Sequence, residues 1–279
     1  MAALRLLTVA AILVAGLAAP AGAGSAPTRM RFDRGAEDCT QVTPAAIEPP
    51  ASDRRPVRID VTVLLDGVPL RDAEATMRGA ASSYTPLGMR LVTTYRPISL
   101  AADGDRATSG GTKPAMDVRG AIADAKTALQ GARPSGSDVV YVMTAKDLFT
   151  FTDDDGDGIP GEDERSYGIA GYADCIGGVR YADRAFAIGE VATRVSVAIA
   201  GLEMFGSFSE KVAAHEIGHL FGAQHHLSNC SEGVAAEARG GTPVDVGPCT
   251  LMFNDVGLAT LHFSSLNAAV VRGHVRYLQ

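Results

Sequence analysis

The stretch His215–His225 reads HEIGHLFGAQH, and four of the six histidines in the 279-residue chain lie between positions 215 and 226. On a helix, His215 and His219 project from the same face, so both imidazoles can bind one Zn²⁺ at about 2.0–2.1 Å. His225 lies too far along to reach that ion from the same helix. The chain must therefore fold back at Gly222, because glycine readily adopts the left-handed conformation that such a reversal needs.

Glu216 stands next to a ligand position but off the ligand face, so it can lean toward a metal without binding it. Three neutral histidine ligands leave a position for water, whose pKa zinc lowers toward 7, and a neighbouring carboxylate can accept its proton. A surface helix that carries histidines by chance is the simpler interpretation, but the third histidine at this spacing argues against it. The pattern predicts a zinc site with ligands His215, His219 and His225, and with Glu216 as general base.

The residues before the motif favour a helix independently of it. Ser207–Glu210 reads SFSE, a capping box that predicts a helix start. A buried helical face opposite the ligands is predicted from Ala213, Ile217, Leu220 and Phe221.

The motif resembles the signature of the metzincin zinc metallopeptidases, in which a methionine-containing turn follows the third histidine. Cys249–Met252, which reads CTLM, is similar to that turn, and Gly177–Val179, Arg184–Gly189 and Phe263–Leu266 are similar to segments of the adamalysin or reprolysin branch. The resemblance implies that Met252 is an apolar floor under the histidines, although ordinary core packing would bury it too. It also implies that a peptide substrate lies extended along an edge strand around residues 176–188.

The pattern upstream of the motif predicts an α/β (α+β) fold. Residues 57–63 alternate as a half-buried strand, and further strands are expected at 89–94 and 138–143. Helices are expected at 72–83 and 117–129. Such alternation predicts a mixed twisted sheet with helices packed on it. The resemblance implies a metzincin-like catalytic domain with an active-site helix and a Met-turn.

The N-terminal residues predict a secreted protein. Residues 1–23 combine Arg5, a short apolar run and a small-residue cleavage site, as a signal peptide does. We expect residues 24–55 to form an N-terminal extension or short propeptide and residues 56–279 to form the catalytic domain. Losing Arg5 takes the formal charge from −7 to −8, which disfavours nucleic acid or an anionic membrane as partner. The expected mature protein is an extracellular monomer.

Four cysteines in a secreted chain predict two disulfides with three connectivities. We favour Cys39–Cys175 and Cys230–Cys249. The alternative is that Cys39 is a zymogen switch, with its thiolate at the open zinc position, as the resemblance to metzincins allows.

Residues 153–164 read DDDGDGIPGEDE, an acidic segment in the register of a calcium loop. A calcium ion would be bound by the side chains of Asp153, Asp155, Asp157 and Glu164 and by the backbone carbonyl of Ile159. A solvated acidic loop is the alternative.

Together these features predict a zinc endopeptidase that hydrolyses internal peptide bonds of proteins and peptides, with Zn²⁺ and possible Ca²⁺ as bound ions. A gluzincin-type peptidase would use Glu237 in place of His225. A non-catalytic secreted module that binds calcium and zinc is the alternative from another class.

Overall fold

The computed structural model describes residues 37–40, 56–108, 110–156, 159, 161–167, 169–191, 196–199, 202–205, 208–225, 250–252, 261–275 and 278. Several sequence predictions fall outside these residues: the signal peptide at 1–23, most of the extension at 24–55, Asp157, Cys230, Glu237 and Cys249. Among the helices in these ranges, none is long and apolar enough to cross a membrane.

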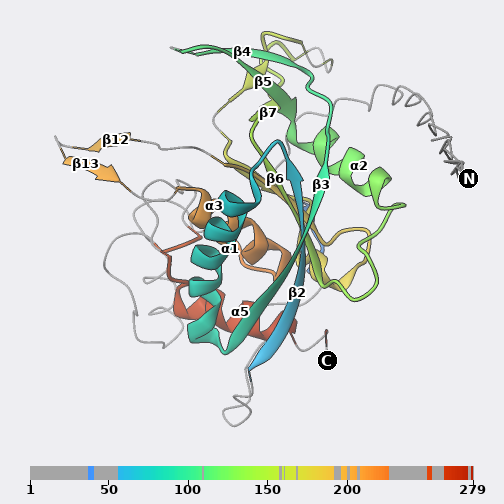
Figure 1. Cartoon of the computed structure of the whole chain (residues 1–279), viewed down its shortest axis with the longest axis vertical. Helices are drawn as coiled ribbons and strands as arrows, with labels where there is room; N and C mark the ends of the chain where they lie inside the picture. Colours follow the sequence, from blue (N-terminus) through green and yellow to red (C-terminus); the bar gives the residue numbers. More distant parts are fainter. Residues whose placement is uncertain are drawn as a thin grey trace, which may run out of the picture.

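A five-stranded mixed sheet forms the centre of the fold (Figure 1). Its order is β3 (Met89–Ile98), β2 (Val57–Asp66), β6 (Val139–Thr144), β11 (Phe186–Glu190) and β9 (Gly171–Ala173). The first four strands run parallel, and β9 pairs antiparallel with β11. The strands predicted at 57–63, 89–94 and 138–143 are confirmed, and the first two run further than their alternation indicated.

Helices cover both faces of this sheet, which confirms the α/β prediction. On one face lie α1 (Leu70–Tyr84) and α3 (Phe208–Leu220), and on the other lies α2 (Val118–Ala128). The buried strand β6 divides its side chains between them. Val139, Tyr141 and Met143 join the core beneath α1 and α3, whereas Val140 and Val142 join the core beneath α2, as the two-residue period of a strand requires.

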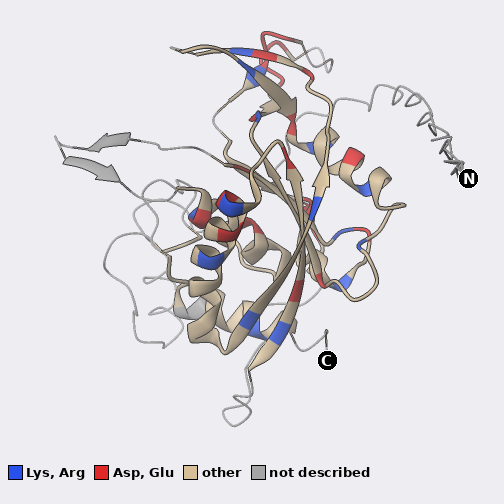
Figure 2. Cartoon of the chain, viewed as in Figure 1, with Lys and Arg blue, Asp and Glu red and all other residues tan. Residues whose placement is uncertain are grey.

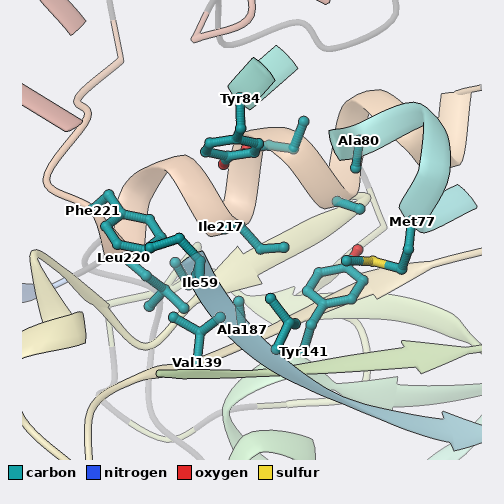
Figure 3. Close-up of a cluster of buried hydrophobic side chains, with 14 of the residues drawn as sticks. Ile59, Met77, Ala80, Tyr84, Val139, Tyr141, Ala187, Ile217, Leu220 and Phe221 are labelled. Carbon is teal, nitrogen blue, oxygen red and sulfur yellow. The ribbon is translucent and has the colours of Figure 1, made fainter. Parts of the chain in front are cut away.

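The helix α3 is fixed by its apolar side chains and by α1. Figure 3 shows Ile217 and Leu220 of α3, with Phe221 just after the helix, in the same cluster as Ile59 and Val139 of the sheet. The Tyr84 hydroxyl at the end of α1 donates a hydrogen bond to the carbonyl of Ala214 at 2.7 Å. The predicted buried face of the helix is thereby confirmed, while Ser207 of the predicted capping box lies outside the described residues.

A four-stranded sheet that the sequence did not reveal lies at the top of Figure 1. Its order is β4 (Gly104–Thr108), β5 (Gly111–Asp117), β7 (Asp147–Phe151) and β8 (Arg165–Ser166). Figure 2 shows residues of both charge signs along β4 and β5. Arg106 and Lys113 from these strands both pair with the buried carboxylate of Asp147, which ties the β4–β5 hairpin to β7.

The remaining elements are short or lie near the C-terminal end. Two two-stranded sheets pair β1 (Glu37–Asp38) with β10 (Cys175–Ile176) and β12 (Ser196–Ile199) with β13 (Leu202–Phe205). The other elements among the described residues are two 3₁₀ turns, η2 (Thr85–Leu87) and η3 (Gly178–Arg180), and the helix α5 (Ser265–Val275).

Candidate metal centre

The three predicted ligand histidines converge on one point. The Nε2 atoms of His215 and His219 lie 3.1 Å apart, and the Nε2 of His225 lies 2.8 Å from the first and 3.1 Å from the second. His215 and His219 are buried, whereas His225 is exposed at the surface. Side chains from a helix and from the chain beyond it therefore meet as the spacing predicted.

Backbone carbonyls orient two of these imidazoles. The Nδ1 of His215 lies 2.7 Å from the carbonyl oxygen of Leu251, and the Nδ1 of His219 lies 2.7 Å from that of Ala223. A carbonyl oxygen only accepts, so each Nδ1 carries the proton and each Nε2 directs a lone pair at the common point. Burial lowers the pKa of the His219 imidazole well below its ordinary value, and the neighbouring His215 and His225 lower it further.

This donor set fits zinc. Three neutral imidazole nitrogens that face one another repel unless a cation lies between them, and a three-histidine set is a known arrangement for catalytic zinc. His225 completes the set, which favours it over Glu237, the gluzincin alternative that lies outside the described residues.

A Schellman turn returns the chain from α3 toward the ligands. The N–H of Gly222 donates to the His219 carbonyl at 2.8 Å, and the N–H of Ala223 donates to the Gly218 carbonyl at 3.0 Å. Gly222 has a φ of +85°, as predicted for the residue at this reversal. Because the turn also supplies the Ala223 carbonyl, it both positions His225 and orients His219.

The segment Thr250–Met252 lies directly against α3. Met252 is fully buried, and its sulfur would lie 3.1 Å from a Cβ atom added to Gly218 on that helix. Its neighbour Leu251 donates its N–H to the His262 carbonyl at 2.8 Å and accepts from His215. The residue predicted as the floor of the site thus packs against Gly218, which directly precedes the ligand His219 and follows the ligand His215 by three residues.

Glu216 is buried beside the ligand set, with 6% of its surface exposed. Burial raises the pKa of its carboxyl group to about 8. On the sheet, Gly171 of β9 lies against this side chain, since an added Cβ would lie 2.8 Å from the Glu216 Oε1 atom. A nearby cation favours the charged form and lowers such a pKa again.

The edge strand differs from the sequence prediction. An edge was expected around residues 176–188, but Phe186–Glu190 forms the inner strand β11, and the edge strand is β9 at Gly171–Ala173. The prediction was wrong because a continuous apolar run such as Phe186–Ile188 is typical of a strand buried on both sides. A three-residue strand is too short to show an alternating pattern.

The predicted disulfide between Cys39 and Cys175 is present. The alternative role of Cys39 as a thiolate on the metal is therefore wrong for this structure, because its sulfur is bonded to Cys175. The predicted Cys230–Cys249 bond lies outside the described residues.

The acidic loop brings together three of its predicted calcium ligands. One carboxylate oxygen each from Asp153, Asp155 and Glu164 lies within 4.8 Å of the others. The buried Glu164 carboxylate accepts hydrogen bonds from the N–H groups of Asp154 at 2.9 Å and Gly161 at 2.8 Å. Ile159 is 69% exposed, and Asp157 lies outside the described residues.

Comparison with known proteins identifies the family of the chain. The sequence profile of the metallo-peptidase family M12B, reprolysin-like, matches residues 76–226, more than half of the chain. Among solved structures, an archaemetzincin from Methanopyrus kandleri covers 78% of this chain and 96% of its own, at 14% identity and a TM-score of 0.45. No curated protein matches the chain significantly. The three converging histidines are a donor set that fits zinc, and the chain belongs to the reprolysin-like metallo-peptidases of family M12B.

Proposed function

We propose that the protein is a secreted zinc endopeptidase in which Glu216 is the general base. The observation that carries this proposal is the meeting of three Nε2 atoms within 3.1 Å of one another, next to a buried carboxylate. Bound zinc supplies a Lewis acid for the scissile carbonyl and lowers the pKa of its water. Glu216 accepts the proton of that water and passes it to the leaving amine.

The burial of Glu216 suits this role. Burial raises the pKa of this carboxyl group to about 8. An adjacent cation lowers the pKa again, so that it can lie near neutral pH. A general base works best when its pKa lies near the operating pH, since it must both accept and release the proton. Gly171 packs directly against the Glu216 side chain, so closely that only a residue without a Cβ atom fits at this position.

The edge strand β9 is the proposed backbone partner of the substrate. The pairing of Asp174 with Phe186 and of Ala170 with Glu190 directs the N–H and C=O groups of even-numbered residues toward β11. The corresponding groups of Gly171 and Ala173 therefore point away from β11, to the edge of β9 that no other strand of the described residues pairs with. An extended peptide that pairs there antiparallel passes Glu216, because Gly171 lies against its side chain.

The first experiment tests zinc binding and cleavage together. The protein from residue 24 onward should contain one equivalent of zinc and cleave denatured proteins at internal bonds. Glu216→Gln should keep zinc and lose at least about 100-fold in rate, since a general base contributes about 10²–10⁴. Glu210→Gln on the same helix is the matched control and should stay active. Cleavage that survives in Glu216→Gln would refute the assigned base.

A second set of variants tests the ligands. His225→Ala should lose zinc, while His226→Ala and Glu237→Ala should retain it. The reverse result, with zinc lost in Glu237→Ala and kept in His225→Ala, would replace the present proposal with the gluzincin type.

Secretion is supported by the signal-like residues 1–23 and by the Cys39–Cys175 disulfide, because disulfides persist in oxidising compartments. Expression of the full chain in a secreting host, followed by N-terminal sequencing of protein from the medium, should give a chain that begins at Gly24. Retention of the uncleaved chain inside the cell would contradict it.

We also propose that the loop at 153–164 holds calcium. The support is the ligand register of the sequence together with the approach of the Asp153, Asp155 and Glu164 carboxylates. Glu164 adjoins β8, which pairs with β7, so calcium would order the outer part of the four-stranded sheet.

A further inference from the structure

The side chain of Asn267, in the first turn of α5, pairs with the backbone of the residue that precedes the ligand His225. Its Oδ1 accepts the N–H of Gln224 at 3.1 Å, and its Nδ2 donates to the Gln224 carbonyl at 3.1 Å. A primary amide offers one acceptor oxygen and one donor nitrogen. Only one orientation of the Asn267 amide satisfies both backbone groups, so the two bonds fix the amide and the loop together.

These two bonds act on consecutive peptide units, and each unit serves a different ligand. The N–H of Gln224 belongs to the same unit as the carbonyl of Ala223, which accepts from the Nδ1 of His219 at 2.7 Å. The carbonyl of Gln224 belongs to the unit that continues into His225. A peptide unit is planar, so a bond to one of its polar atoms also restrains the other. Asn267 therefore restrains both the carbonyl that orients His219 and the backbone that carries His225.

Asn267 is itself held in place by α5. It is buried, and its N–H donates to the Ser264 hydroxyl at 3.1 Å, which is the N-cap bond of this helix. The N–H of Ala268 donates to the Ser264 carbonyl at 2.8 Å. Further along, Val271 and Val275 are buried in the core that α3 and the central sheet share. The amide of Asn267 thus projects from a capped and packed helix end, which favours a fixed geometry.

The chain just before α5 also supports the first ligand. Leu251, whose carbonyl accepts from the Nδ1 of His215, donates its own N–H to the carbonyl of His262 at 2.8 Å. His262 lies two residues before Ser264, the N-cap residue of α5. The segment from His262 to Asn267 therefore contacts backbone groups behind all three ligands.

We propose that Asn267 is a positioning residue of the zinc site and holds His225 in place through the backbone of Gln224. The inference rests on the ligand set of the function proposed above. His215 and His219 lie within α3, whereas His225 is exposed and lies beyond the end of this helix. The backbone of His225 therefore depends on restraints from outside α3, and the Asn267 amide supplies two of them.

Replacing the amide should weaken zinc binding although all three ligands remain. Outer partners of ligating histidines contribute about 10–100-fold to metal affinity. Asn267→Leu keeps a side chain of similar size but leaves both backbone groups of Gln224 without this partner, so zinc should bind about 10–100-fold more weakly. Asn267→Asp keeps an acceptor for the N–H but places a carboxylate against the Gln224 carbonyl, so its loss should fall in the same range. Competition with a chromophoric chelator measures both.

Val271→Ala is the control for a general loss of stability. Val271 is fully buried one turn further along the same helix, and its side chain has no polar atom that could bond to the ligand loop. This variant should unfold at a lower urea concentration than the wild type in the zinc-free state, yet keep the zinc affinity of the wild type. If zinc affinity instead fell in step with stability in every variant, Val271→Ala included, the positioning role would be overturned.

The visible spectrum of the Co²⁺-loaded protein reads the geometry of the ligand set directly. Co²⁺ absorbs more strongly at a four-coordinate site than at a site with additional water ligands, so the bands report whether the third histidine is bound. At metal saturation, Asn267→Leu should show weaker and shifted bands, whereas Val271→Ala should give the wild-type spectrum. A wild-type spectrum in both Asn267→Leu and Asn267→Asp would overturn the inference.

The unmodified protein offers a measurement that does not depend on the folding of a variant. Gln224 is an exposed residue, but its amide is bonded to Asn267 and should exchange slowly with solvent in the zinc-free protein. Nuclear magnetic resonance detects this amide directly. Exchange as fast as that of an unprotected amide would refute the restraint on which the inference depends.

His225→Ala separates this inference from the proposed function. If His225→Ala retained zinc, the ligand set proposed above would fail, and the role of Asn267 would fail with it. If His225→Ala lost zinc while Asn267→Leu kept wild-type affinity and spectrum, the inference alone would fail. None of these measurements requires cleavage, so a protein that bound zinc but cut no peptide would leave the role of Asn267 standing.

Discussion

The imidazole of His274 on α5 packs so tightly against Gly222 that a Cβ atom on this glycine would overlap its Nε2 and Cδ2 atoms. Gly222 is thus constrained twice, by its φ of +85° and by His274. The contact connects the C-terminal helix to the turn that separates the ligands His219 and His225.

Gly222→Ala should therefore destabilise the protein and weaken zinc binding together. Left-handed backbone costs a non-glycine residue about 1–2 kcal/mol, and overpacking adds about 1–3 kcal/mol. We expect a loss of about 2–5 kcal/mol in the free energy of unfolding, measured by urea titration, and at least about tenfold weaker zinc binding.

Gly131→Ala is the matched control for that variant. Gly131 also follows a helix and has a φ of +90°, but an added Cβ would have no neighbour within 4 Å. It should lose only about 1–2 kcal/mol and keep its zinc affinity. Equal losses in the two variants would show that the contact with His274 contributes nothing.

His274 should make the protein less stable in acid. The pKa of its imidazole is lowered to about 4, chiefly by burial and also by the charge of Arg180, with Asp38 acting in the opposite direction. Because the unfolded chain takes up this proton at about pH 6.5 and the folded chain only near pH 4, stability is lost as the pH falls through this range.

The measurement is urea unfolding of the zinc-free wild type and His274→Gln between pH 7 and pH 4. A glutamine stays neutral, so the wild type should lose up to about 3 kcal/mol more than the variant over this range. Parallel pH profiles for the two proteins would contradict the assignment to His274.

Met252 should contribute mainly through its volume. Removing a fully buried methionine side chain costs about 2–5 kcal/mol, whereas a leucine of similar size costs less than about 1.5 kcal/mol. Met252→Ala should therefore unfold at lower urea concentration than Met252→Leu. Both should retain zinc, because the three ligands are unchanged. Zinc loss in Met252→Leu, without loss of stability, would instead indicate a specific role for the sulfur.

The features that the sequence predicted are those with a local signature. The position of His215, Glu216 and His219 on one helix follows from a spacing of four residues, and the reversal at Gly222 follows from the spacing to His225. The strands at 57–63 and 138–143 were visible because long alternating or continuous apolar runs reflect burial on one or both faces.

The features that it did not predict depend on contacts between distant residues or on backbone groups. The carbonyls of Leu251 and Ala223 orient the ligands, yet any residue type supplies a carbonyl. The pairing of β1 with β10 joins positions far apart in the chain, and neither strand exceeds two residues. Only the hairpin of β4 and β5 had an overlooked signal, in the turn-forming pair Ser109-Gly110.

Calcium binding by the acidic loop should depend on Glu164 and not on its neighbour Glu162. Glu164 is buried and approaches Asp153 and Asp155, whereas the Glu162 side chain is 91% exposed and pairs only loosely with Arg165 at 3.7 Å.

Calorimetric titration of the zinc-loaded protein should give one calcium site with a Kd of about 10⁻⁴–10⁻³ M, typical of extracellular modules. Glu164→Gln keeps an acceptor oxygen for one of the two backbone N–H groups and removes the charge, so it should weaken binding at least about tenfold, while Glu162→Gln should leave it unchanged. Equal effects of the two variants would mean that the loop attracts calcium only through its net charge.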